Sequence, residues 1–201
     1  MLLFGHVGLT AGAVRVWEML TSTNRAHGSN ELAASSKVAP PHLSGPVKSR
    51  IAIDYRLVLL GSLLPDIIDK PVWLVATRLN PEVSLSGRDY AHTLLFSLAL
   101  LLTLVLLRYK KLSWLVLPLG SLMHVVFDQV WKSPAVLLWP WLGPLPKEET
   151  ADWWGNLFRE LFSHPDVYLP EIIGLTVILL LACDVIRKRN VIGFLKDGTI
   201  R

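Results

Sequence analysis

The chain carries long runs of apolar residues that contain almost no charge, and these runs limit what it can fold into. Residues 94–107 are nearly all leucine or another apolar residue, and residues 172–183 are equally apolar. A helix that is apolar on every side has no face to turn toward water. Only 18% of the 201 residues are charged, against about 25% in soluble domains. We therefore expect a membrane protein, and a soluble helical bundle is the disfavoured alternative.

Five apolar segments can be distinguished along the chain. They are Leu2–Leu20, Ile51–Ile68, Thr93–Leu107, Leu112–Trp131 and Leu169–Ile186. A full span needs roughly 20 apolar residues, and several segments reach that length only if their polar ends face the protein interior. The short stretch Pro71–Leu79 is expected to lie at the membrane interface. We predict an all-α fold: a polytopic transmembrane bundle of about five helices, forming one membrane-embedded domain over residues 1–201.

The basic residues predict how this bundle is oriented. If the chain crosses the membrane five times, one side of the membrane holds residues 21–50, 108–111 and 187–201, and the other side holds residues 69–91 and 132–168. The first side holds 12 of the 20 Lys and Arg residues and the second holds 6. Because basic residues are retained in the cytoplasm, we expect the first side to be cytoplasmic in a multi-pass protein of the cell membrane. Residues 21–50 then form a polar, mobile cytoplasmic loop, and residues 187–201 form a cytoplasmic tail.

Ionisable residues occur at one end of the segments. His6 opens the first segment, Asp66 closes the second, His92 opens the third, and His124 and Asp128 lie late in the fourth. All five fall toward the non-cytoplasmic side. This agreement is an independent check on the orientation, because the orientation was derived from Lys and Arg residues alone. Ionisable residues in membrane segments are costly and usually functional. Their agreement predicts a metal site near the non-cytoplasmic face.

The pair His124 and Asp128 is the most specific local motif. Residues four apart share one helix face, so both side chains can ligate one ion or bracket two. A buried carboxylate must be paired or bound to metal. The alternative is a His–Asp hydrogen bond that only holds helices together.

Three further residues are weaker candidates for the same site. Asp69 follows Asp66 by three residues, but it can also be a solvated helix end. Glu171 opens the fifth segment, where the helix dipole alone favours a carboxylate. His164 lies on the same side of the membrane, but in an expected loop.

The residue types suggest which metal and which chemistry. A single cysteine, Cys183, excludes a disulfide within the chain and a cysteine-rich zinc module. Histidine and carboxylate ligands suit Zn²⁺ or a similar first-row divalent ion. Such an ion with an open position lowers the pKa of bound water and yields a nucleophile near neutral pH. We expect hydrolysis in which Asp66, His124 and Asp128 act, and the sequence contains no P-loop, serine hydrolase or zincin motif.

The order of the short motifs carries a family resemblance. The motifs are Gly5-His6, Leu64-Pro65-Asp66-Ile67, His92-Thr93-Leu94-Leu95, and His124-x-x-x-Asp128 followed by Leu137-Leu138-Trp139-Pro140. This order resembles the membrane-bound, metal-dependent hydrolases of bacteria and archaea, a family distantly similar to zinc-dependent phospholipase C. The resemblance implies a phosphoester or lipid-like substrate and metal roles for His6, Asp66, His92, His124 and Asp128.

Two departures from that family reduce the number of ions expected. The family commonly reads Pro-Asp-Ile-Asp-His, whereas this chain reads Pro65-Asp66-Ile67-Ile68-Asp69-Lys70. The family's His-Arg-Gly-x-Thr-His is reduced to Arg88-Asp89-Tyr90-Ala91-His92. With fewer histidines, the resemblance implies one or two ions rather than a larger cluster.

A non-catalytic metal-ion or proton pathway could use the same buried His and Asp residues. Such a pathway needs polar residues that continue to the cytoplasmic side, whereas the segments become apolar beyond the cluster. The expected partners are therefore membrane lipid and a small-molecule or lipid substrate. Nucleic acid is not expected, because the basic residues lie between apolar segments rather than in one patch.

Overall fold

The computed structural model describes residues 3–35, 53–80, 85–107, 112–146 and 153–200, and the regular elements of these residues are all helical. This confirms the predicted all-α class. The five longest helices among the described residues are α1 (Leu3–Ser35), α2 (Tyr55–Leu79), α3 (Leu94–Leu106), α4 (Val116–Phe127) and α7 (Pro165–Arg187). The shorter elements are η1 (Leu112–Leu115), η2 (Val130–Lys132), α5 (Pro134–Leu137), α6 (Trp153–Ser163) and α8 (Val191–Asp197).

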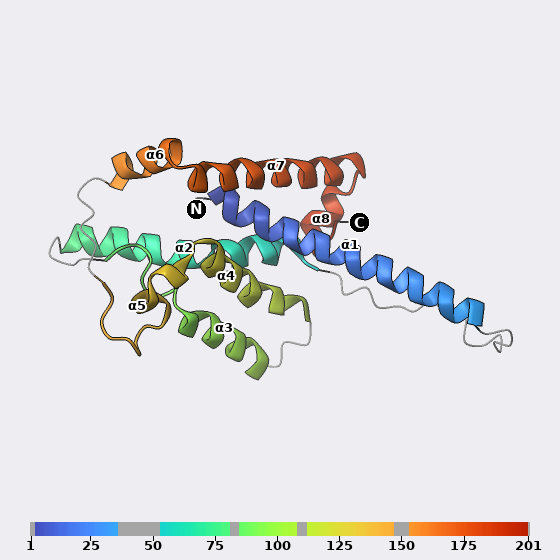
Figure 1. Cartoon of the computed structure of the whole chain (residues 1–201), viewed down its shortest axis with the longest axis horizontal. Helices are drawn as coiled ribbons and strands as arrows, with labels where there is room; N and C mark the ends of the chain where they lie inside the picture. Colours follow the sequence, from blue (N-terminus) through green and yellow to red (C-terminus); the bar gives the residue numbers. More distant parts are fainter. Residues whose placement is uncertain (1–2, 36–52, 81–84, 108–111, 147–152, 201) are drawn as a thin grey trace.

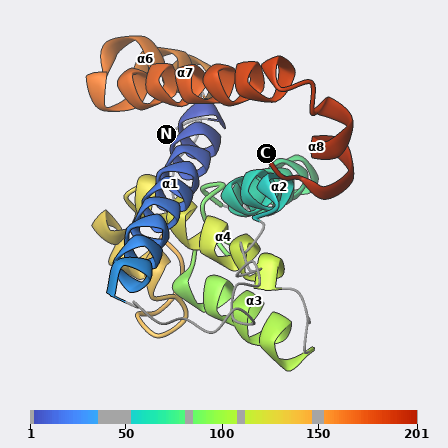
Figure 2. The same cartoon turned by 90° about the vertical axis from the view of Figure 1, so that its right-hand side faces the viewer.

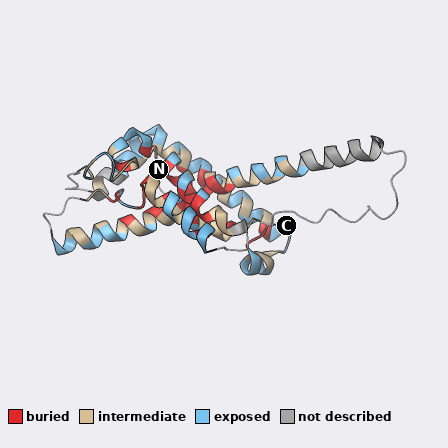
Figure 3. Ribbon diagram, turned by 90° about the horizontal axis from the view of Figure 1, so that it is seen from below, coloured by how far each residue is buried: buried red, intermediate tan, exposed pale blue. Residues whose placement is uncertain are grey.

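The helices pack in a simple order across the molecule. Helix α7 lies against α1, α1 against α2 and α4, α2 against α4, and α4 against α3 (Figures 1 and 2). Buried residues gather where these helices cross in the middle of the molecule (Figure 3). Outward-facing leucines such as Leu106 and Leu180 are strongly exposed. An apolar outer surface of this kind is what a lipid environment covers.

Two crossings bring helix backbones unusually close. A Cβ atom on Gly8 would overlap the backbone of Gly174, which joins α1 to α7. A Cβ atom on Gly61 would overlap the backbone of Leu117, and one on Gly120 would lie 2.9 Å from the carbonyl carbon of Gly61, which joins α2 to α4. Small residues allow such contacts between membrane helices.

The ends of the helices are capped by nearby polar groups. Thr93 caps α3, since its side-chain oxygen accepts a hydrogen bond from Phe96 N at 3.1 Å. Asp54 caps α2 by accepting one from Arg56 N at 3.0 Å. After α7 the chain turns back through α8 toward α2 (Figure 2), where Tyr55 N donates to Gly198 O at 2.9 Å.

Two sequence predictions about segment boundaries are wrong. The expected loop 21–50 is helical as far as Ser35, because α1 continues; residues 36–50 lie outside the described residues. The stretch Pro71–Leu79 is the last part of α2 rather than a separate segment, and its position at the membrane interface stays a prediction. The predicted cytoplasmic tail 187–201 contains α8, and its side of the membrane also stays a prediction. A polar residue reduces helix stability by less than about 1 kcal/mol, so an established helix can continue beyond the end of its apolar run.

Within the described residues, α7 is the one helix both long and apolar enough to cross a membrane by composition. Helices α3 and α4 are apolar but have only 13 and 12 residues. A bundle of about five spanning helices therefore stays a prediction.

Candidate metal centre

Five ionisable side chains from separate parts of the chain meet at one end of the helix bundle. His6 lies in the first turns of α1, Asp66 in α2, and His92 just before α3. His124 lies in the last turn of α4, and Asp128 is the C-terminal cap of that helix. In Figure 1 the starts of α1 and α3 and the end of α4 are the left-hand ends of these helices, and α2 continues past them to the left. All three histidines are fully buried.

The glycine crossings place these side chains. The contact between Gly61 and Gly120 brings α2 and α4 close enough for the Nδ1 atom of His124 to lie 2.6 Å from the carbonyl oxygen of Ser62. One turn further along α2, Asp66 then faces the same histidine. The approach of α1 to α7 similarly fixes the start of α1, which carries His6.

Three donor atoms have the spacing of ligands around one ion. The Nε2 atoms of His92 and His124 are 3.2 Å apart. The Oδ1 atom of Asp66 lies 3.6 Å from the Nε2 of His92 and 3.8 Å from that of His124. Ligands at about 2.0–2.2 Å from a tetrahedral zinc ion lie about 3.3–3.6 Å from one another. These three side chains can therefore bind one ion after a small adjustment.

A second group of donors lies beside the first and shares His124. The Nε2 atom of His6 is 3.5 Å from Oδ1 of Asp128. The rings of His6 and His124 are stacked, with centroids 3.9 Å apart. The donor atoms of His6, His124 and Asp128 all lie within 4.8 Å of one another. The arrangement has room for two ions, or for one ion with a neighbouring His–Asp pair.

Hydrogen bonds at the far side of two rings determine which nitrogens are free to ligate. The carbonyl of Ser62 can only accept, so the Nδ1 atom of His124 carries the hydrogen. The Nδ1 atom of His92 lies 2.7 Å from Oδ2 of Asp69 and donates to that carboxylate. In both neutral rings the Nε2 lone pair then points to the shared centre. Two lone pairs 3.2 Å apart repel each other unless a cation, a proton or a metal ion, lies between them.

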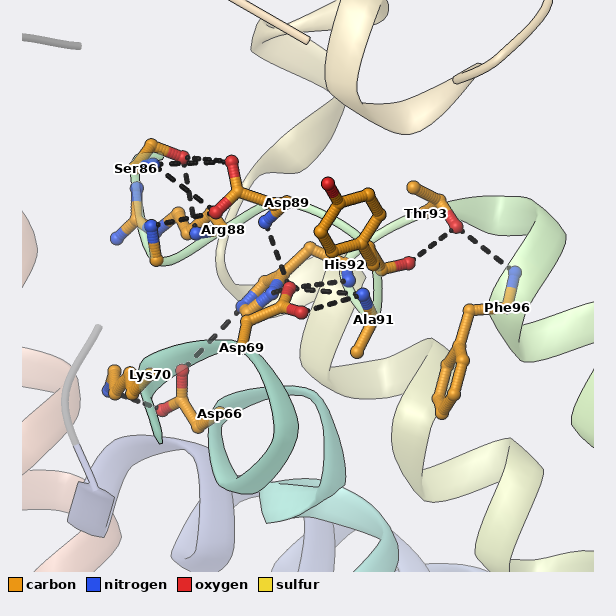
Figure 4. Close-up of polar contacts among 12 residues, drawn as sticks. Asp66, Asp69, Lys70, Ser86, Arg88, Asp89, Ala91, His92, Thr93 and Phe96 are labelled. Atoms are coloured by element: carbon orange, nitrogen blue, oxygen red, sulfur yellow. Dashed lines mark hydrogen bonds and ion pairs between the residues drawn. The ribbon is translucent and has the colours of Figure 1, made fainter. Parts of the chain in front are cut away.

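Asp69 contacts the Nδ1 side of the His92 ring, opposite the Nε2 atom that faces Asp66 (Figure 4). Its buried carboxylate accepts hydrogen bonds from the backbone nitrogens of Asp89 at 2.9 Å, Ala91 at 3.0 Å and His92 at 3.3 Å. These bonds shape the loop before α3 and orient the imidazole. A carboxylate behind a ligating histidine is usual at metal sites.

Two basic side chains contact the outer oxygens of the cluster. The Nζ atom of Lys70 lies 2.6 Å from Oδ2 of Asp66, and the Nε atom of Arg88 lies 2.7 Å from Oδ2 of Asp128. Neither residue is a site candidate from the sequence alone. The spacing of Asp66 and Lys70, four residues apart in one helix, is a usable signal for an ion pair. Arg88 and Asp128 are 40 residues apart, and no sequence pattern indicates their contact.

The remaining candidates lie elsewhere. Glu171 is buried in α7 and accepts a hydrogen bond from Phe4 N at 2.9 Å, so it ties α7 to the start of α1. His164 is exposed and precedes α7. Among the described residues, neither belongs to a group whose donor atoms lie close enough to share an ion.

The model of the YdjM inner membrane protein family matches residues 1–191 of the chain. The match includes all five clustered residues. No curated protein and no solved structure matches significantly. The match supports the membrane-protein part of the resemblance drawn from the sequence, and it carries no indication of a hydrolase or of similarity to phospholipase C.

Proposed function

Since the chain belongs to the YdjM inner membrane protein family, and is thus a cell-membrane protein, we propose that it is a membrane-embedded, metal-dependent hydrolase. Its centre is formed by His6, Asp66, His92, His124 and Asp128. The observation that carries the proposal is the pair of Nε2 atoms of His92 and His124, 3.2 Å apart. In each ring the Nδ1 atom donates a hydrogen bond to Asp69 or to the carbonyl of Ser62, so the Nε2 atom keeps a lone pair that can bind a cation.

The donor set favours zinc or a similar divalent ion. Two imidazole nitrogens and one carboxylate oxygen are the ligands of many catalytic zinc sites, in which the fourth position stays open for water. When bound there, such an ion lowers the pKa of the water and supplies a nucleophile near neutral pH. The pair of Asp128 and His6 lies beside this position, 3.5 Å apart. The pair either holds a second ion or accepts the proton that the attacking water gives up.

Aromatic residues near the cluster support a substrate that is reached from the membrane surface. Tyr90 is exposed, two residues before His92, and packs edge-on against Trp139 with ring centroids 5.5 Å apart. Trp131 is exposed, three residues after Asp128. Tryptophan and tyrosine concentrate at the depth of lipid headgroups. A phosphoester or lipid-like substrate is therefore the class that we propose.

A metal-ion or proton pathway is less well supported. Between the cluster and the opposite end of the bundle, α1 and α2 bury Ala11 and Val58, which form an apolar core with Tyr55. Beyond this core the hydroxyl of Tyr55 donates to Glu18 at 2.7 Å. An apolar layer of this kind favours a site that opens to one side.

Metal analysis of the purified full-length protein tests the proposal. We expect wild-type protein in detergent to hold one or two equivalents of zinc and to hydrolyse a phosphoester such as p-nitrophenyl phosphate. His124→Ala should lose both properties, whereas His164→Ala, which changes an exposed histidine, should keep both. Wild-type protein that holds no divalent metal after incubation with zinc would refute the proposal.

A further inference from the structure

Each of two carboxylates in the cluster is shared between imidazole nitrogens and one basic side chain. Asp66 points Oδ1 toward His92 and His124, and Oδ2 toward Lys70. Asp128 places Oδ1 3.5 Å from Nε2 of His6, and Arg88 contacts both of its oxygens, Oδ2 at 2.7 Å and Oδ1 at 3.4 Å. Each basic group is thus separated from the donor nitrogens by a single carboxylate.

The basic groups form the outer edge of the cluster. The side chains of Asp66 and Asp128 are 13% and 2% exposed, whereas those of Lys70 and Arg88 are 42% and 53% exposed. A molecule that reaches the centre from water or from the headgroup region therefore meets the ammonium and the guanidinium group first.

The balance of charge depends on the metal. Asp66, Asp69 and Asp128 carry negative charges, and Lys70 and Arg88 carry positive charges. Each divalent ion adds two positive charges to this cluster. A loaded centre with two basic groups at its edge therefore attracts an anion more strongly than the empty centre does.

We propose that Lys70 and Arg88 recognise the phosphate group of the substrate. Resting on the proposed function, this inference names phosphate esters rather than carboxylic esters or amides as the substrate class. The contacts at 2.6 and 2.7 Å use one N–H group of Lys70 and the Nε–H group of Arg88. The two terminal nitrogens of the Arg88 guanidinium would offer parallel N–H groups to phosphate oxygens. The ammonium of Lys70, which has three N–H donors, would add a point charge.

Phosphate binding by the zinc-loaded full-length protein in detergent tests this role. Inorganic phosphate is titrated calorimetrically into wild-type protein and into Arg88→Gln and Lys70→Gln. Each variant should bind phosphate about tenfold more weakly, since each loses a charge-assisted hydrogen bond. The zinc content should stay at the wild-type level. Matched controls are Arg78→Gln and Lys132→Gln, which remove a charge from exposed positions and should change neither property.

Two further measurements separate recognition from support of the fold. Arg88→Lys keeps the charge but loses the paired donors, so it should bind phosphate more tightly than Arg88→Gln and more weakly than wild type. Removing zinc with a chelator should sharply weaken phosphate binding by wild-type protein, because the positive charge of the ion is then lost. Hydrolysis of p-nitrophenyl phosphate and of phosphatidic acid in mixed micelles then tells a soluble phosphate ester from a lipid headgroup.

The outcomes are distinguishable from failure of the proposed function. Unchanged phosphate affinity in Arg88→Gln and Lys70→Gln, with zinc retained, overturns the recognition role alone. Loss of zinc from both variants also overturns it, because the basic groups would then support the ligands. Wild-type protein without zinc refutes the hydrolase, and the inference with it.

Discussion

Replacing Asp69 with asparagine tests how the centre is held in shape. The carboxylate of Asp69 is 1% exposed. It accepts backbone hydrogen bonds from Asp89, Ala91 and His92 at 2.9, 3.0 and 3.3 Å, and a side-chain bond from His92 at 2.7 Å. Asparagine has nearly the same shape and keeps one acceptor oxygen. It loses the negative charge that strengthens the bond to the imidazole.

The expected effect on metal binding is large, but the effect on folding is small. Removing an outer partner of a ligating histidine weakens metal binding about 10- to 100-fold, which corresponds to about 1.4–2.8 kcal/mol. Most backbone donors of the loop still reach the carbonyl oxygen of the amide, because three of them already bond Oδ2. Asp69→Asn should therefore fold and bind zinc weakly.

Asp69→Ala is the comparison that removes the acceptor altogether. Three backbone N–H groups would lose their partner in a buried position. An unsatisfied buried donor costs about 1–3 kcal/mol, so the total is about 3–9 kcal/mol, similar to the whole stability of many proteins. We expect this variant to misfold or to be lost during purification.

The assay is zinc affinity by competition with a chelator, together with thermal unfolding in the same detergent. The expected order of zinc affinity is wild type, then Asp69→Asn, then Asp66→Asn, because Asp66 is a proposed ligand and Asp69 supports one. If Asp69→Asn binds zinc as tightly as wild type, the carboxylate does not orient His92 and this reasoning is refuted.

Three other predictions follow from the same geometry. Gly174→Ala should lower the free energy of unfolding by about 1–3 kcal/mol, because its Cβ atom would overlap the backbone of α1. Gly12→Ala is the control: its Cβ atom meets only a side chain, so the loss should be smaller. Equal unfolding temperatures of the two variants would contradict the close crossing. Asp128→Asn should purify as a folded protein without zinc or hydrolytic activity, and a variant that keeps both would remove Asp128 from the centre. With the native cysteine replaced, a cysteine at Asp166 should react with an impermeant thiol reagent in intact cells and one at Lys188 should be shielded; the reverse pattern would invert the predicted orientation.

The membrane class and the cluster residues could be read from the sequence because both depend on local patterns. An apolar run such as residues 172–183 must avoid water whatever surrounds it. A histidine or aspartate at the end of such a run is costly enough to indicate a function. Threading the runs back and forth put His6, Asp66 and His92 on one side, and their convergence needs only that neighbouring helices pack together. Thr93 caps its helix through a contact three residues away, which is equally local.

The ends of the helices could not be predicted from local sequence patterns in the same way. The sequence predicts that α1 stops near residue 20, where polar residues begin, but a polar composition alone does not end a helix. Likewise the sequence predicts that the second segment ends at Ile68, yet α2 continues to Leu79.

Only the tertiary structure decided the roles of the charged residues around the cluster, which are Asp69, Lys70 and Arg88. The sequence presents Asp69 as a possible ligand, whereas the fold directs its carboxylate to backbone nitrogens 20 to 23 residues later in the chain. Lys70 and Asp66 are four residues apart in one helix, so their contact is local. The contact of Arg88 with Asp128 joins positions 40 residues apart that carry no local signal. It depends on tertiary packing, because the close glycine crossing of α2 and α4 sets where the buried carboxylates lie.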